Sequence, residues 1–266
     1  MFEYADRTAL ITGASSGIGA SFARKLAARR MNLVLVARNA DRLNALADEL
    51  RTRHRIEVTV LPLDLSEPDA ISRIEAALAE HGVTVDLLVN DAGFGTNGAF
   101  VEIEPARERE EILVNVLAVV ELCHLLIPGM VARGYGAIIN VASNTAFQPV
   151  PYMAVYAATK SFVLSFSQAL HVELARSNVR VLGLCPGPTS TEFFSNAKAD
   201  RLGRMASATM RTPSQVVETA LKALNANRSS VVDGAIFSAA AVFGKLIPPS
   251  WQARMIGRAL HPSTKD

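Results

Sequence analysis

The chain has 266 residues, of which 50% are hydrophobic, and its 27 Lys and Arg against 25 Asp and Glu give a formal net charge of +2. This length suits one large domain with a substantial core. Balanced charge without a run of one sign argues against a nucleic-acid partner.

The N-terminus lacks the basic and apolar regions of a signal peptide. We see no apolar run near the roughly 18 residues of a membrane span. Cys123 and Cys185 lie in apolar surroundings, outside any C-x-x-C pair, which favours buried reduced thiols. We therefore expect a cytoplasmic protein, and we identify no metal ligands.

Near-continuous apolar runs, typical of strands buried on both faces, occur at Thr8–Ile11, Asn32–Ala37, Glu57–Leu63, Val85–Val89, Gly136–Val141, Val179–Cys185 and Ser230–Val232. Helical patterns separate them at Gly17–Arg29, Asp41–Thr52, Pro68–Glu80, Pro105–Val131, Ala154–Ser177 and Pro213–Asn225. The alternation predicts an α/β fold over residues 1–266. We expect a single Rossmann domain with a doubly wound, mostly parallel sheet of about seven strands and helices on both faces.

A glycine-rich turn joins the first strand to the first helix, and its distinctive residues are Gly13, Ser15, Ser16, Gly17, Ile18 and Gly19. Glycines let a backbone approach a pyrophosphate, and the helix N-terminus favours its negative charge. The spacing differs from G-x-G-x-x-G because Phe22 stands where the third glycine would be. A tight turn in a nucleotide-free domain is the alternative interpretation.

The second strand is followed by Arg38, where an NAD enzyme usually carries an acid for the ribose 2′-hydroxyl. A guanidinium can pair with a 2′-phosphate, which favours NADP(H), although Arg38 could be a plain surface side chain. Further polar and small residues follow the third and fourth strands, where open α/β sheets bind ligands: Asp64, Leu65, Asn90, Ala92 and Gly93. Asp64 could instead cap the next helix.

Tyr156 and Lys160 are four residues apart on a predicted helix, so they share one face, and Ser143 follows the fifth strand. A free tyrosine has a pKa near 10, and a neighbouring ammonium lowers it. Tyr156 could then act as a general acid in reduction or a base in oxidation, while Ser143 hydrogen-bonds the substrate oxygen. Taken alone, the tyrosine–lysine pair could be a chance pair on an exposed helix.

Together these motifs resemble those of the classical short-chain dehydrogenases/reductases over about residues 5–235. The family pattern T-G-x-x-x-G-x-G matches Thr12–Gly19, and its serine–tyrosine–lysine set matches Ser143, Tyr156 and Lys160. The resemblance implies a catalytic role for Asn115, which would support a water linking Lys160 to bulk solvent. It also implies that Tyr156 exchanges the proton and that Lys160 holds the nicotinamide ribose. It further places Asp64 near adenine, Asn90 along the cofactor cleft, and Pro186, Gly187 and Thr189 at the nicotinamide.

The family's N-N-A-G appears here as Asn90-Asp91-Ala92-Gly93. An ionised aspartate only accepts hydrogen bonds, whereas asparagine also donates them. We therefore expect that Asp91 does not support the sheet in the usual way, and that Asp91→Asn preserves or raises thermal stability.

These observations favour an NADP(H)-dependent oxidoreductase that interconverts a carbonyl and an alcohol, with a small hydrophobic ketone (acyl, steroid-like or aromatic) as substrate. Apolar residues near Tyr156 or after Pro186 are candidates for lining its site: Phe94, Phe147, Val150, Tyr152, Met153, Phe193, Phe194, Met205 and Met210. A catalytically silent NADP(H)-binding sensor or scaffold, and non-redox chemistry of the same family, are the alternatives.

Two segments depart from the strand–helix alternation. Residues 189–212 are weakly patterned and predict a mobile lid over the substrate. Residues 239–266 form an atypical C-terminal extension, with Trp251, Met255, Ile256 and Leu260 at roughly helical spacing. It could pack over the substrate cleft, join a subunit interface or lie on a membrane surface, and we favour a plain packing helix. The resemblance alone implies a homodimer or homotetramer, with contacts through the helix at 154–177.

Overall fold

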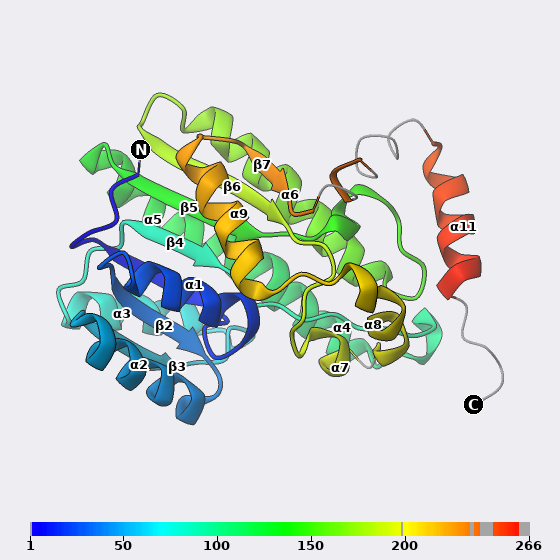
Figure 1. The fold of residues 1–266 in the computed structure, drawn as a ribbon, viewed down its shortest axis with the longest axis horizontal. Coiled ribbons are helices and arrows are strands. Elements are labelled where there is room, and N and C mark those ends of the chain that lie inside the picture. The colour runs from blue at the N-terminus through cyan, green and yellow to red at the C-terminus, as the bar shows by residue number, and fades with distance from the viewer. Residues whose placement is uncertain (1, 198, 235–236, 240–246, 261–266) are drawn as a thin grey trace.

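The computed structural model describes residues 2–197, 199–234, 237–239 and 247–260. It contains a seven-stranded sheet in the order β3-β2-β1-β4-β5-β6-β7, with every neighbouring pair parallel (Figure 1). The strands are β1 (Thr8–Thr12), β2 (Asn32–Ala37), β3 (Val58–Pro62), β4 (Leu87–Asn90), β5 (Gly136–Val141), β6 (Val179–Cys185) and β7 (Ser230–Val232). The predicted α/β fold is confirmed, and the strand order reverses between β1 and β4.

Helices cover both faces of the sheet because successive strand side chains point to opposite sides. In β1, Ile11 faces the cluster formed with α1 (Gly17–Ala27), α2 (Ala40–His54) and α9 (Pro213–Asn225). Leu10 faces the opposite cluster, formed with α3 (Ala70–Glu80), α5 (Ala118–Arg133) and α6 (Ala154–Glu173). These helices match the predicted ones, with ends displaced by a few residues.

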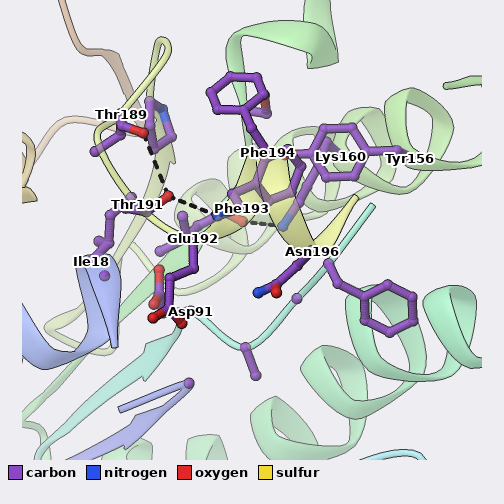
Figure 2. Close-up of a pocket in the computed structure, with 18 of the residues that line it drawn as sticks. Ile18, Asp91, Tyr156, Lys160, Thr189, Thr191, Glu192, Phe193, Phe194 and Asn196 are labelled. Atoms are coloured by element: carbon purple, nitrogen blue, oxygen red, sulfur yellow. Dashed lines mark hydrogen bonds between the residues drawn. The ribbon is translucent and has the colours of Figure 1, made fainter. Parts of the chain in front are cut away.

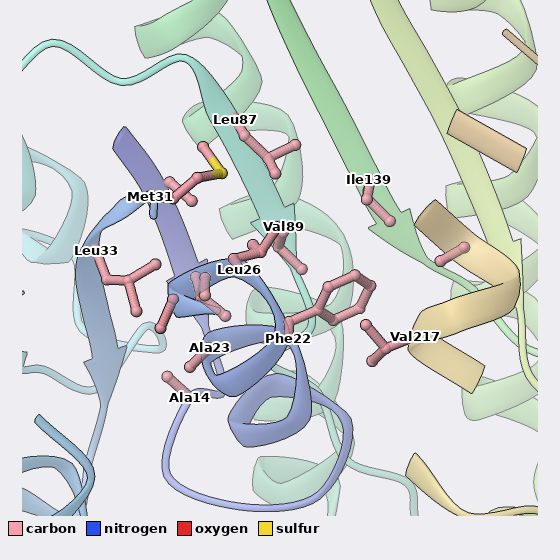
Figure 3. Packing of buried hydrophobic residues seen from close by; sticks show 14 of the residues in the cluster. Ala14, Phe22, Ala23, Leu26, Met31, Leu33, Leu87, Val89, Ile139 and Val217 are labelled. Atoms are coloured by element: carbon pink, nitrogen blue, oxygen red, sulfur yellow. The ribbon is translucent and has the colours of Figure 1, made fainter. Parts of the chain in front are cut away.

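Phe22 explains why the glycine-rich turn lacks a third glycine. Its ring is fully buried in the cluster that joins α1, the sheet and α9, close to Val217 (Figure 3). Burying a phenylalanine of this kind stabilises a fold by roughly 1.5–3 kcal/mol. Phe22 therefore anchors α1 to the core, and Gly19 is the residue that allows the turn and the helix to approach each other closely.

The long helix predicted at Pro105–Val131 is a continuous path of three segments. It comprises α4 (Pro105–Ile112), the π-helical turn η2 (Leu113–Leu117) and α5, which ends at Arg133. By length and composition alone this path could cross a membrane, and a third of its most apolar window is buried. The expectation that no segment reaches that length is therefore corrected.

Short elements surround the carboxyl ends of the strands. They are η1 (Phe100–Glu102), η3 (Asn144–Phe147), α7 (Phe193–Asn196), α8 (Asp200–Ala206), η4 (Ser207–Thr209) and α11 (Pro249–Leu260). The predicted lid at 189–212 thus contains short helices, and its mobility stays a prediction. Residues 240–246 and 261–266 of the predicted extension lie outside the described residues.

Candidate active site

A cavity of about 780 Å³ opens at the carboxyl ends of the strands. Most of the predicted site residues line it: Gly13, Ser15, Ser16, Gly17, Ile18, Arg38, Asp64, Leu65, Ala92, Gly93, Ser143, Tyr156, Lys160, Pro186, Gly187 and Thr189. They come from the loops or helices that follow each of β1 to β6. Topology therefore brings together residues that are up to 176 positions apart, from Gly13 to Thr189.

The β1–α1 turn packs closely against the loop after β4 and leaves the N-terminus of α1 open toward the cavity. Gly13 has φ +67°, and a Cβ there would lie 2.9 Å from the Ala92 nitrogen. At the start of α1, Ser16 makes no side-chain capping bond, and the first turn holds no acidic residue. The positive end of the helix dipole is thus left for an anion supplied from the cavity. These features fit the pyrophosphate of a dinucleotide.

Basic side chains line the cavity beyond this turn. Arg38 is two-thirds exposed and lies 3.7 Å from Asp64, measured between Nη1 and Oδ2. Asp64 accepts hydrogen bonds from both the backbone and the hydroxyl of Ser66, so it closes its own turn. The alternative that Asp64 caps the next helix is wrong, because α3 begins after Asp69. Arg42, which the sequence analysis missed, lines the cavity and pairs with Glu192 at 2.8 Å.

Three predicted residues do not line the cavity. Asn90 donates to Asn140 at 2.9 Å inside the sheet, which corrects the expectation that it lines the cofactor cleft. Gly19 lies against the Gly13 carbonyl, where a Cβ would collide, so its contribution is close packing. Asn115 is buried in the π-helical turn, donates to Phe94 and Thr159, and accepts from the Phe94 nitrogen. Its role in a water relay stays a prediction.

Ser143, Tyr156 and Lys160 meet at one side of the cavity, as Figure 2 shows for the last two. The Lys160 ammonium lies 5.8 Å from the centre of the Tyr156 ring and donates to the Val141 carbonyl at 2.8 Å. The Ser143 hydroxyl accepts from the Thr145 nitrogen at 3.1 Å. Three side chains, one from the loop after β5 and two from α6, are thereby held around one point.

Burial dominates the electrostatics of these groups. It raises the pKa of Tyr156 despite a hydrogen bond from Ser143, and the nearby carboxyls of Glu111 and Asp91 raise it further. Burial lowers the pKa of Lys160 to about 8, against the opposing attraction of the same two carboxyls. We expected Lys160 to lower the pKa of Tyr156. In the structure, the contact that lowers the pKa of Tyr156 is the hydrogen bond from Ser143.

Asp91 lies at the floor of the cavity beside Ile18 and the start of α1 (Figure 2). Burial raises its pKa to about 7, while Lys160 and a hydrogen bond from the Gly19 backbone favour the ionised form. Asp91 therefore receives a hydrogen bond from α1. An asparagine oxygen could accept the same bond, so the family residue would also fit here.

The far end of the cavity is apolar. Of the candidates named from sequence, Phe94, Val150, Met153, Phe193 and Phe194 line it, whereas Phe147, Tyr152 and Met210 do not. The Met205 side chain lies outside what the structure describes. Leu202, Ile256 and Leu260 also line it and pack with Val150, Met153 and Tyr156. The sequence analysis missed Leu202. The helical spacing of Ile256 and Leu260 predicted a helix here, and α11 packs over the cavity, which was one of the three interpretations of this segment.

Comparison with protein families gives a match to the model described as "short chain dehydrogenase" over residues 7–202. A human protein named very-long-chain 3-oxoacyl-CoA reductase is 30% identical over 263 residues, which cover 97% of this chain and 80% of the relative. The bovine protein of that name is 35% identical, and that match covers 70% of this chain but 60% of the relative.

Solved structures agree. A short-chain dehydrogenase from Sphingobium yanoikuyae in complex with NADPH has a TM-score of 0.82 at 33% identity, with 98% of both chains covered. A 7beta-hydroxysteroid dehydrogenase has a TM-score of 0.86 at 28% identity, covering 96% of this chain and 98% of the other. A family member from Burkholderia phymatum in complex with NAD has a TM-score of 0.84 at 26% identity, covering 94% of this chain and 98% of the other.

Proposed function

The chain belongs to the short-chain dehydrogenase family, and on that premise we propose that it reduces a hydrophobic ketone with NADPH, using Tyr156 as the proton donor. The observation that carries this proposal is the meeting of Ser143, Tyr156 and Lys160 between a phosphate-fitting turn and an apolar wall. Bound NADPH would supply the hydride, and the protein supplies orientation, the proton and charge stabilisation.

Different residues of this chain would bind the cofactor, orient the substrate and supply the proton. The turn from Gly13 to Ile18 would hold the pyrophosphate, and Thr189 with Pro186 and Gly187 would hold the nicotinamide end. Tyr156 stays protonated at neutral pH because burial raises its pKa, which suits a proton donor to a forming alkoxide. Ser143 would donate a hydrogen bond to the substrate oxygen and orient it. Lys160, held by the Val141 carbonyl, would bind the nicotinamide ribose.

We prefer NADP(H) over NAD(H) because Arg38 stands where an acid would bind a ribose 2′-hydroxyl. The structural relative that holds NADPH supports this preference, whereas another relative holds NAD. An apolar substrate is supported by the lining from Val150, Met153 and Phe193. The names of the acyl-CoA reductase and hydroxysteroid relatives point the same way.

We further propose a cytoplasmic homodimer or homotetramer. Large apolar side chains are exposed on α4–α5 and α6, among them Ile112, Leu117, Val131, Phe162 and Val172. A second copy of the chain would cover them. Light scattering of the purified protein tests this assembly; a monomer, or a protein that needs detergent, would contradict it.

The function is tested by NADPH oxidation against a panel of 3-oxoacyl thioesters, cyclic and steroid ketones, and aryl ketones. We expect turnover, and we expect Tyr156→Phe to lose at least about 100-fold of it, since a proton donor contributes typically 10²–10⁴-fold. Tyr135→Phe is the matched control, because its hydroxyl bonds the Glu3 carbonyl and lies outside the cavity lining. NADPH binding without turnover would favour a sensor, and product formation without NADPH oxidation would favour non-redox chemistry.

A further inference from the structure

Helix α4 buries a charged residue and exposes an apolar one. Glu111 is fully buried, the single buried residue between Pro105 and Ile112, while the neighbouring Ile112 is 46% exposed. Amphipathic helices normally show the reverse pattern. A buried carboxyl is costly unless it is paired, so packing does not account for a glutamate at this position.

Glu111 has incomplete hydrogen bonding. Its Oε2 accepts from the Thr96 nitrogen at 2.9 Å, but its Oε1 is buried without a hydrogen-bond partner among the described residues. An unmade hydrogen bond in the interior costs roughly 1–3 kcal/mol. Such a cost is often found at functional sites, where a buried charge acts on its neighbours.

The carboxyl lies one layer behind the catalytic pair. Thr96 follows Gly95, where a Cβ would lie 3.0 Å from the Tyr156 ring, so the loop held by Glu111 packs directly on that ring. One turn farther along the same helical path, Asn115 holds Phe94 of this loop. The loop is therefore clamped from α4 on one side and lies against α6 on the other.

We propose that Glu111 is a positioning residue whose negative charge tunes proton exchange by the Tyr156–Lys160 pair. This inference rests on the proposed function. The carboxylate holds the loop under Tyr156, makes its phenolate less favourable, and makes the Lys160 ammonium more favourable.

The neighbouring charges are compatible with this role. Burial raises the pKa of Glu111 to about 7, Glu108 on its own helix also raises it, and Lys160 of α6 and the Thr96 contacts lower it. Asp91, at the end of β4, acts on Tyr156 and Lys160 in the same direction as Glu111. Arg107 on α4 is engaged with Glu110 at 2.9 Å and lies over the Phe94 ring.

The test is the pH profile of kcat/KM for oxidation of the alcohol corresponding to the best ketone of the panel, with NADP⁺. The ascending limb reports the group that must lose its proton, which is Tyr156 in this proposal. Glu111→Gln keeps an acceptor for Thr96 but removes the charge. We expect its limb to move to lower pH by about half a unit or more, because a nearby like charge no longer opposes the phenolate. Glu111→Asp keeps the charge and should leave the limb near its original pH.

Glu121→Gln is the matched control, since Glu121 is exposed on α5 of the same continuous helix. Its limb should not move. A limb that stays in place in Glu111→Gln, with unchanged NADPH affinity and circular dichroism, would overturn the inference, as would a move to higher pH. A uniform loss of kcat at every pH would also overturn it, because that is the result of a purely structural role. If Tyr156→Phe retains activity, the proposed function itself fails, and the two failures are therefore distinguishable.

Discussion

Replacing Asp91 by asparagine should stabilise the protein, and the gain should grow with pH. Burial raises the pKa of this carboxyl from 3.8 to about 7. The folded state therefore binds a proton more tightly than the unfolded state, and wild-type stability falls as pH rises from about 4 to about 7. An asparagine does not titrate, so this loss disappears in Asp91→Asn.

The size of the effect follows from that pKa change. At about 1.4 kcal/mol per pKa unit, the wild-type penalty above pH 7 is on the order of 4 kcal/mol. The attraction of Lys160 for the ionised carboxylate is already contained in that pKa, but the variant amide also buries an NH2 group that needs an acceptor, which offsets part of the gain. We therefore expect a net gain of about 1–3 kcal/mol at pH 8, roughly 2–10 °C in Tm for a chain of this size, and little difference near pH 4.

The assay is urea or thermal unfolding of both proteins at several pH values from 4 to 9. Because both keep Glu111, the difference between their curves isolates Asp91. Asp86→Asn is the comparison variant, since Asp86 is also a buried carboxyl, 6% exposed, but it accepts from the Thr8 nitrogen at 3.1 Å and lies 3.9 Å from Arg7, so its replacement should lower stability. A less stable Asp91→Asn at pH 8, or a gain that is equal at pH 4 and pH 8, would refute the reasoning.

Two further variants probe the two ends of the cavity. Arg38→Ala should weaken NADPH binding about 10- to 100-fold, because it removes a charge-assisted hydrogen bond to the cofactor. The affinity for NADH, measured by the same fluorescence titration, should stay within about twofold. Equal losses for both cofactors would count against a 2′-phosphate site. Ile256→Ala should lower kcat/KM about tenfold for long or bulky ketones and less for small ones. Met255→Ala is the control, because Met255 is exposed on the same helix. A uniform loss across the panel would show that α11 supports the fold and does not select the substrate.

Much of the fold and most of the site could be predicted from local sequence. Strands buried on both faces produce unbroken apolar runs such as the one around Leu10 and Ile11, and helices between them force a parallel sheet. A parallel sheet gathers the residues after its strands at one edge, so Gly13, Ser143 and Tyr156 could be assigned to one cavity. These predictions succeed because each needs only the sequence around one residue and the sheet topology, and the alternation of strands and helices determines that topology.

The rest depended on contacts that local patterns do not encode. Asn90 sits in a motif at a strand end, but its partner Asn140 is 50 residues away, and that bond turns the side chain into the sheet. Glu111 belongs to a run of charged residues, which predicts a helix face exposed to solvent. In the structure, however, Glu111 is the buried residue of α4, and a π-helical turn follows this helix, so a regular helical period does not describe which residues are buried. The same turn contains Asn115. The path from α4 through this turn thus carries two polar side chains that bond to the loop under Tyr156. Neither helical periodicity nor composition could have shown that they act on the same loop.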